Sequence, residues 1–460
     1  MKKRNKILMI GLLSTALSMN MVGVGSTKIS INRKTYQEGN TNLVLNKILS
    51  DNELKQEIPH MFNYASNGNY YDGTNDPNFV TEGLYSNVDE DGTTYYYRGN
   101  VKNNNLQFGA YDEDYYVYQG KKARYYQSQE SCEEARNSDC SAVKLASAGD
   151  KMYWKIIRVN GDGSLRLMYT GPGMKLSIVV GPSSFNEEEI SGVIGATPYN
   201  LNNDDPKYTG YTYDNGTDSF VKREIDTWYN NTLGKNSAYD SMVILGRFCS
   251  DSSGYNYDGD GSFASYDRLV QASSDFAKDN APTFACPSTS ESYGGSYRLK
   301  AGLITADELA YAGESVGVEG NSYLNPGQGG IPYWTMTPSY DDRGTRTRGV
   351  ESYSSNNYIM VTFLSFNGIS HFYNLRPVIN IKTDGMTLIG DGTMENPYTL
   401  QVAEQVEEPE GSGSVDNNQE NSFKNPETRS MITIGVTIGL IVVLGTGAFV
   451  IYRKKSKEKI

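Results

Sequence analysis

The chain has 460 residues, 42 Lys and Arg against 54 Asp and Glu, a net charge of −12, and two histidines, His60 and His371. An acidic total without an interior basic block argues against a nucleic-acid partner. Two histidines are also too few for His-rich metal chemistry and for most His-based catalytic sites. The length allows two or three domains with cores of their own.

The N-terminus has the pattern of a secretory signal. Met1–Lys6 is basic, Ile7–Val24 carries no charge, and small residues follow. This pattern predicts a signal peptide over residues 1–26, cleaved near Gly25, and therefore export of the chain. The alternative is an uncleaved signal anchor.

The next two regions differ in their predicted elements. Residues 27–75 form a short helical segment, in which we expect a helix within Asn40–Leu54. Residues 76–300 read as a β-rich region with disulfide-tied insertions. Within it, Thr94–Gly99 predicts a strand, and Met152–Thr170 predicts a hairpin that turns at Asn160–Gly163.

Two helix starts carry capping signals. Ser219 can cap a helix over Ser219–Leu233, and Thr305–Glu308 has the pattern of a capping box, with Gly313 in position to end the helix.

Residues 301–403 form the C-terminal α+β part. We expect strands at Tyr358–Phe366, at Leu375–Ile381 and around Tyr398–Val402. The fold class is therefore α+β, with a mostly antiparallel β ectodomain and short helices.

Four cysteines on an exported chain predict two disulfides. Three pairings exist. We favour Cys132–Cys140, which closes a small loop in an apparent insertion, with Cys249–Cys286, which bridges a Gly-, Ser- and Asp-rich stretch where core residues are scarce. The alternative is a four-thiolate zinc site, which the absence of any Cys-x-x-Cys pair disfavours.

One segment matches the calcium-loop template. Asn256, Asp258, Asp260 and Asp267 supply oxygens at positions 1, 3, 5 and 12, and Ser262 lies at position 7. The side chain at position 12 is shorter than the usual Glu, and no helix precedes the loop. A flexible acidic loop is therefore the alternative, and no cofactor other than calcium is expected.

The C-terminus predicts a membrane anchor. Residues 404–430 form an acidic, Gly- and Ser-rich stalk expected to be disordered. Residues 431–452 carry no charge and are long enough for a transmembrane helix, and residues 453–460 form a basic cytoplasmic tail. The n-region and the tail each carry four net positive charges, which leaves −20 for the segment between them. We therefore expect a single-pass protein of the cell membrane with an acidic extracellular ectodomain.

The residues before this span resemble a sortase sorting signal of Gram-positive surface proteins. Asn425, Pro426, Thr428 and Arg429 occupy the motif, followed by the apolar span and the basic tail. The resemblance implies cleavage after Thr428 and attachment to peptidoglycan by a sortase. Asn425 replaces the commoner Leu and Arg429 replaces the usual Gly, so a simple membrane anchor is the alternative.

Several short sequence segments between residues 81 and 400 resemble those of a group of secreted and surface proteins of Firmicutes to which no activity is assigned. The C-terminal part also resembles, more loosely, the C-type-lectin-like and formylglycine-generating-enzyme-like fold, which usually binds carbohydrate or protein. The reactive cysteine pair of those enzymes is missing after Cys286, so the likeness favours binding over catalysis. The segments that resemble the Firmicutes group are Glu82–Tyr85, Tyr95–Gly99, Trp154–Ser164, Gly302–Glu308, Trp334–Ser339 and Arg376–Asn380.

Tyrosine is unusually frequent, with 36 Tyr against 14 Phe. The rings can contact sugars or proteins, or they can simply be good strand residues. No catalytic motif is evident, and we assign no catalytic residue. His371 reads as an ordinary sheet or loop residue. We expect ligand recognition or adhesion, with a glycan or protein ligand; the alternatives are a glycan hydrolase with a carboxylate pair and a structural surface protein.

Overall fold

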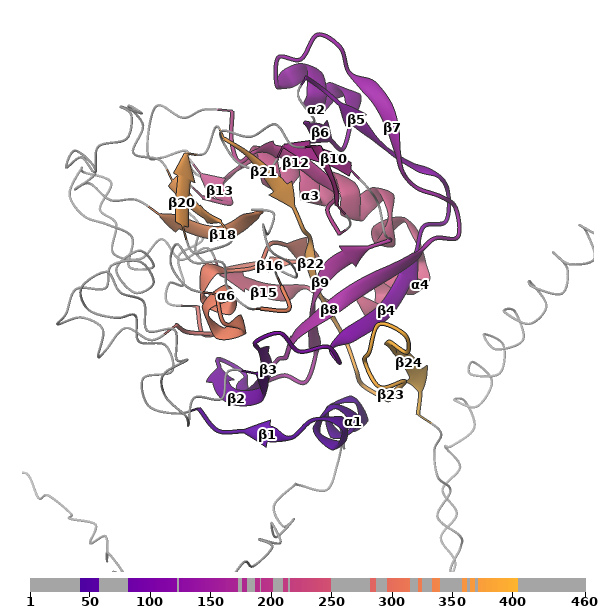
Figure 1. Ribbon diagram of the computed structural model, residues 1–460, viewed down its shortest axis with the longest axis vertical. Helices are drawn as coiled ribbons and strands as arrows, with labels where there is room; N and C mark the ends of the chain where they lie inside the picture. The colour runs from indigo at the N-terminus through magenta and orange to yellow at the C-terminus, as the bar shows by residue number, and fades with distance from the viewer. Residues whose placement is uncertain are drawn as a thin grey trace, which may run out of the picture. The chain divides into compact units, whose positions relative to one another are not determined.

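The computed structural model describes residues 42–57, 82–121, 124–172, 176–179, 187–190, 192–201, 210–213, 216–249, 282–286, 296–314, 322–324, 333–339, 358–361, 365–368 and 371–403. The chain divides into two compact units, residues 1–403 and 404–460, and the described residues belong to the first. They are mostly β-strand with a few short helices, which confirms the coarse fold class (Figure 1).

The largest sheet has ten strands and is built around β8. Strand β8 pairs with β3, β4 and β9, and β9 continues through β22 to β17. All pairs in this sheet are antiparallel except β1–β2 and β4–β24. The strands are β1 (Leu54–Lys55), β2 (Gly83–Asp89), β3 (Gly92–Arg98), β4 (Asn105–Ala110), β8 (Lys151–Val159), β9 (Leu165–Gly171), β17 (Ala301–Gly302), β22 (Val378–Ile381), β23 (Met386–Ile389) and β24 (Tyr398–Val402).

A five-stranded sheet has the order β21-β12-β6-β5-β7. Its strands are β5 (Tyr115–Gln119), β6 (Tyr125–Tyr126), β7 (Ser141–Ala146), β12 (Gly195–Pro198) and β21 (Phe372–Leu375). The smaller sheets comprise β10 (Leu176–Val179) with β11 (Glu187–Ile190), β13 (Thr212–Tyr213) with β14 (Thr217–Asp218), β15 (Gly246–Cys249) with β16 (Ser296–Leu299), and β18 (Trp334–Ser339) with β19 (Tyr358–Val361) and β20 (Ser365–Gly368).

The predicted hairpin is confirmed as β8 and β9, and its turn is closed by the hydrogen bond from Asn160 N to Ser164 O. Two predicted strands are wrong in detail. Leu375–Ile381 is interrupted, so that β21 and β22 belong to different sheets, because Pro377 has no N–H for a ladder. Tyr358–Phe366 is two strands, β19 and β20, which pair as a hairpin.

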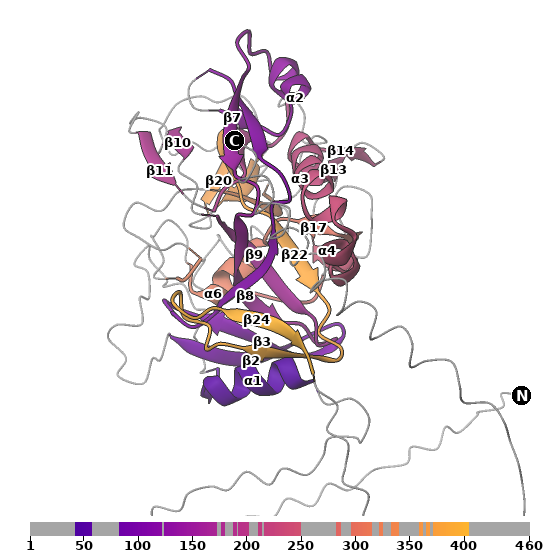
Figure 2. The same cartoon turned by 90° about the vertical axis from the view of Figure 1, so that its right-hand side faces the viewer.

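The two helices with predicted N-caps begin at those residues. Ser219 accepts a hydrogen bond from Lys222 N at the start of α3, and the Thr305–Glu308 capping box opens α6. Gly313 ends α6 in the left-handed conformation at φ 106°, which glycine adopts without strain. The helices are α1 (Leu43–Asp51), α2 (Gln129–Glu134), α3 (Phe220–Asn231), α4 (Ser237–Met242) and α6 (Ala306–Ala312), with a 3₁₀ turn at Leu233–Lys235. Figure 2 shows α1 below β2 and β3.

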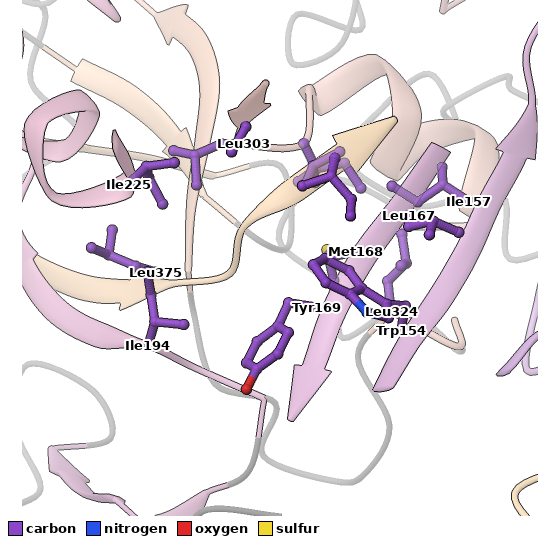
Figure 3. Close-up of a cluster of buried hydrophobic side chains, with 14 of the residues drawn as sticks. Trp154, Ile157, Leu167, Met168, Tyr169, Ile194, Ile225, Leu303, Leu324 and Leu375 are labelled. Atoms are coloured by element: carbon purple, nitrogen blue, oxygen red, sulfur yellow. The ribbon is translucent and has the colours of Figure 1, made fainter. Parts of the chain in front are cut away.

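Aromatic and aliphatic side chains from both large sheets share one core (Figure 3). Trp154 and Tyr169 are buried on β8 and β9 beside Trp228 of α3. The neighbouring tyrosines Tyr125 and Tyr126 of β6 are both buried. These tyrosines serve as strand and core residues, as the structural interpretation of their abundance expects.

Several predicted segments lie outside the described residues: the signal peptide, the calcium-loop residues Asn256–Asp267, the stalk, the sorting motif and the membrane span. Within the described part of the chain, no helix has the length and apolar composition needed to cross a membrane.

Candidate functional site

The candidate site is a recess between β8, β9, β15, α6 and residues 282–286. We call it the arginine recess. Its interior volume is about 10 Å³, which is room for about one water molecule, so a larger ligand would bind across its mouth. Figure 1 shows α6 and β15 next to one another at this place. The lining residues used below are Arg158, Arg166, Arg247, Phe284, Asp307 and Glu308.

Glu308 is the centre of a buried ion cluster. The capping box fixes its backbone and side chain, because Glu308 N donates to Thr305 Oγ1 and Thr305 N donates to Glu308 Oε2. Arg166 Nη2 reaches Oε2 at 3.1 Å, and Arg166 Nε contacts Oε1. Arg158 Nε lies 3.3 Å from Oε1, and its Nη1 lies 2.8 Å from Asp89 Oδ2. Two arginines and two carboxylates therefore neutralise one another inside the protein.

The arginines set the protonation state of Glu308. Burial acts to raise its pKa, but the charges of Arg166 and Arg158 outweigh burial and hold the pKa below the ordinary value. Glu308 is therefore ionised at neutral pH. A general acid of a glycosidase needs a raised pKa, so Glu308 is suited to accept hydrogen bonds and unsuited to donate a proton.

Arg247 of β15 is the least committed cation of the recess. Its Nε lies 3.7 Å from Glu90 Oε1 and its Nη2 lies 3.7 Å from Asp91 Oδ1, both beyond hydrogen-bonding distance. Nε is buried without a hydrogen-bond partner, while the side chain as a whole is 29% exposed. A ligand oxygen at the recess can reach only the exposed part of this side chain.

Residues 282–286 form one wall. The Phe284 ring stacks on Tyr311 with centroids 3.8 Å apart, and the Arg158 guanidinium lies 4.8 Å from the Phe284 centroid. Thr283 N donates to Asp307 Oδ1 at 2.9 Å, and the Cys249–Cys286 disulfide joins the segment to β15. Phe284 and Asp307 are each 4% exposed, so this wall is tightly packed and holds both side chains in place.

Both favoured disulfides are present. The Cα atoms are 6.1 Å apart in Cys132–Cys140 and 5.4 Å apart in Cys249–Cys286, within the ordinary range. All four cysteines are paired, so a four-thiolate zinc site is excluded. Glu90 lies close to the sulfurs of Cys249 and Cys286, but sulfurs bonded to each other are not thiolate ligands.

Glu224 of α3 is a second buried carboxyl group, outside the recess. It is 0% exposed, and its Oε2 accepts a 2.6 Å hydrogen bond from Gln127 N, while Oε1 has no partner. Burial raises the pKa of Glu224 to about 7, although hydrogen bonds from the Ser131 side chain and the Gln127 backbone N–H offset part of the effect. Glu224 thus lies where the disulfide-tied segment of α2 and β6 meets α3.

The sequence interpretation missed the arginine recess. Arg158 and Arg166 have apolar neighbours on both sides in their strands, and 150 residues separate Arg158 from Glu308. The only local indication was that each arginine lies at a strand position expected to be buried. A buried charged residue usually has an oppositely charged partner. His371, by contrast, is a half-buried residue near Tyr373 whose pKa burial lowers.

Comparisons with protein-family models, with curated proteins and with solved structures gave no match to this chain.

Proposed function

We propose that this protein is a surface-anchored recognition protein whose arginine recess binds a neutral, hydroxyl-rich ligand such as a glycan. The observation that carries the proposal is the combination, in a single recess, of mutually neutralised ions, an arginine whose ion contacts are 3.7 Å long, and a packed aromatic ring.

The charge arrangement favours hydroxyl groups over ions. Arg158 and Arg166 are already paired with carboxylates, so an anionic ligand would face Glu308 and Asp307, and a cation would face the guanidinium groups. A hydroxyl group can donate to a carboxylate and accept from a guanidinium at once. Thr283, Thr305 and Thr337 also line the recess.

The aromatic wall supplies an apolar contact for the ligand. Phe284 is held in place by Tyr311 and Tyr96, and the disulfide of Cys286 joins its segment to β15. The ring is 4% exposed, so only its edge can contact the apolar face of a sugar, at little cost in side-chain entropy.

The cellular context is part of the same proposal. Two disulfides are typical of an exported protein, and the predicted signal peptide and anchor place the ectodomain outside the cell membrane. Attachment to peptidoglycan through Thr428, calcium at Asn256–Asp267 and a C-type-lectin-like arrangement around Trp334 belong to this proposal and rest on sequence patterns alone.

A glycan array probed with the purified full chain tests the proposal. Arg247→Ala should weaken binding at least about tenfold, because the residue offers a charge-assisted hydrogen bond. Arg223→Ala is the matched control, since Arg223 is 46% exposed and pairs with Glu134. Binding no stronger than that of an unrelated acidic protein, or equal binding by the Arg247 variant, would contradict the proposal.

A further inference from the structure

Three candidate metal ligands from three separate segments meet beside the arginine recess. They are Glu90 in the turn between β2 and β3, Cys249 at the end of β15, and Cys286 of residues 282–286. A carboxylate oxygen of Glu90 and the two sulfur atoms all lie within 4.8 Å of one another. In the oxidised chain the sulfurs are bonded to each other, so the group becomes a set of metal ligands when this disulfide is reduced.

Residues 282–286 are held at the recess by contacts that do not depend on the disulfide. Tyr311 Oη donates to the carbonyl of Pro282 at 2.6 Å, and the Phe284 ring stacks on the same tyrosine with centroids 3.8 Å apart. Phe284 is also 4% exposed, so its packing anchors the segment. Reduction removes one covalent link and leaves these contacts, so Cys286 keeps its place.

The backbones of Cys249 and Glu90 are fixed as well. Cys249 is opposite Ser296 in the antiparallel ladder of β15 and β16. Glu90 lies in the two-residue turn that joins β2 to β3, and its Oε1 accepts a 2.5 Å hydrogen bond from Cys286 N. All three ligand-bearing segments are therefore in place before a metal binds.

The donor atoms and their spacing suit zinc. Tetrahedral Zn²⁺, with Zn–S bonds of about 2.3 Å and a Zn–O bond of about 2.0 Å, separates two sulfurs by about 3.8 Å and a sulfur from an oxygen by about 3.5 Å. Both separations fall within the 4.8 Å span of the group. Two thiolates and a carboxylate exceed the charge of Zn²⁺ by one, and Arg247 Nε, 3.7 Å from Glu90 Oε1, offsets this excess.

The second disulfide does not have these surroundings. Cys132 is 0% exposed, and within the described part of the chain no third His, Cys, Asp or Glu joins the Cys132–Cys140 pair in a group of ligand atoms. Cys249 and Cys286, by contrast, are half-buried and Glu90 is exposed, so a metal ion can reach them from solvent.

We propose that Glu90, Cys249 and Cys286 form a zinc site in the reduced chain, and that formation of the disulfide releases the metal. A dithiol reductant supplies two electrons and two protons and becomes a disulfide itself, while the bond between the two cysteines breaks to give two thiols. Zn²⁺ then replaces the two thiol protons, which pass to solvent, and binds both thiolates and the carboxylate, with water as the fourth ligand. A disulfide oxidant reverses the exchange. The site does not depend on the proposed glycan ligand.

Metal titration of the purified full chain tests this site. The chain is reduced with a dithiol, the dithiol is removed without oxygen, and Zn²⁺ is titrated in competition with a chromophoric chelator. We expect one equivalent of Zn²⁺ to bind the reduced chain and none to bind the oxidised chain. Co²⁺ in place of Zn²⁺ should give the visible absorption of tetrahedral thiolate coordination.

Two pairs of serine variants identify the cysteines that bind. Cys132→Ser with Cys140→Ser should bind Zn²⁺ as the unmodified chain does, because the proposed site is intact. Cys249→Ser with Cys286→Ser should bind none. In the unmodified reduced chain, Zn²⁺ should protect Cys249 and Cys286 from alkylation, as measured by peptide mass spectrometry, and should not protect Cys140.

Glu90→Gln tests the third ligand. It should weaken Zn²⁺ binding at least about tenfold, since even partners outside the ligand set are worth that much. Glu113→Gln, which changes a carboxylate that is 63% exposed, is the matched control and should bind normally. Zinc binding by the oxidised chain, undiminished binding without Cys249 and Cys286, or no binding by the reduced chain would overturn the proposal. The comparison of reduced and oxidised chain needs no variant, so a folding defect in a variant does not affect it.

Discussion

Replacing Glu308 with Gln is the sharpest perturbation of the buried ion cluster. Gln keeps the size of the side chain and an oxygen that can accept from Thr305 N, so the capping box is preserved. What changes is the charge, which leaves Arg166, 1% exposed, without its carboxylate. Arg158 retains Asp89 at 2.8 Å.

Removal of one partner from a buried ion pair costs about 3–5 kcal/mol, because the remaining charge is buried and uncompensated. We therefore expect Glu308→Gln to lower the free energy of unfolding by about 3 kcal/mol, the lower end, since one of the two arginines keeps a partner. Urea denaturation followed by tryptophan fluorescence measures the change, because Trp154 lies in the core on the same strand as Arg158.

Two further variants make the reasoning refutable. Adding Arg166→Met to Glu308→Gln removes the stranded charge and should recover at least half of the loss. Asp114→Asn, which removes an exposed carboxylate paired with Lys144, should change the free energy little. A loss below about 1 kcal/mol for Glu308→Gln, or no recovery in the double variant, would show that the cluster is not a coupled buried unit.

The remaining predictions concern Glu224 and Phe284. The pKa of Glu224 is raised from 4.5 to about 7, so the folded protein binds more protons than the unfolded chain between these values. Stability should therefore fall by about 3 kcal/mol as pH rises from 4.5 to 7 through this group, and Glu224→Gln should remove that slope in urea titrations across pH; an unchanged slope would refute the assignment. Phe284→Ala should cost about 3 kcal/mol and speed proteolysis near Cys286, as its ring packs on Tyr311 and Tyr96; unchanged proteolysis would argue against residues 282–286 as a packed wall.

Local signals in the sequence predicted the local structure. The capping box at Thr305–Glu308 and the turn at Asn160–Gly163 depend on residues within a few positions of one another, and both form as expected. The strand break at Pro377 could also be predicted from the sequence, because proline has no N–H. The apolar residues between Leu375 and Ile381 favoured one continuous strand instead.

The site itself could not be read from the sequence, because it depends on contacts between distant segments. Arg158 and Glu308 meet only because β8 and α6 pack together, and the Cys249–Cys286 disulfide adds a third segment. The cysteine pairing could be favoured in advance because Cys132 and Cys140 are close in the sequence and only three pairings exist. Among 54 acidic residues, no local pattern distinguishes Glu308 as the partner of two arginines.

A crystal of the full chain soaked with the glycan that binds most strongly on the array tests the central claim most directly. The account predicts ligand density at the mouth of the arginine recess, with a hydroxyl group within hydrogen-bonding distance of Arg247 and the sugar against the edge of Phe284. Density at another surface, with the recess filled only by water, would contradict it.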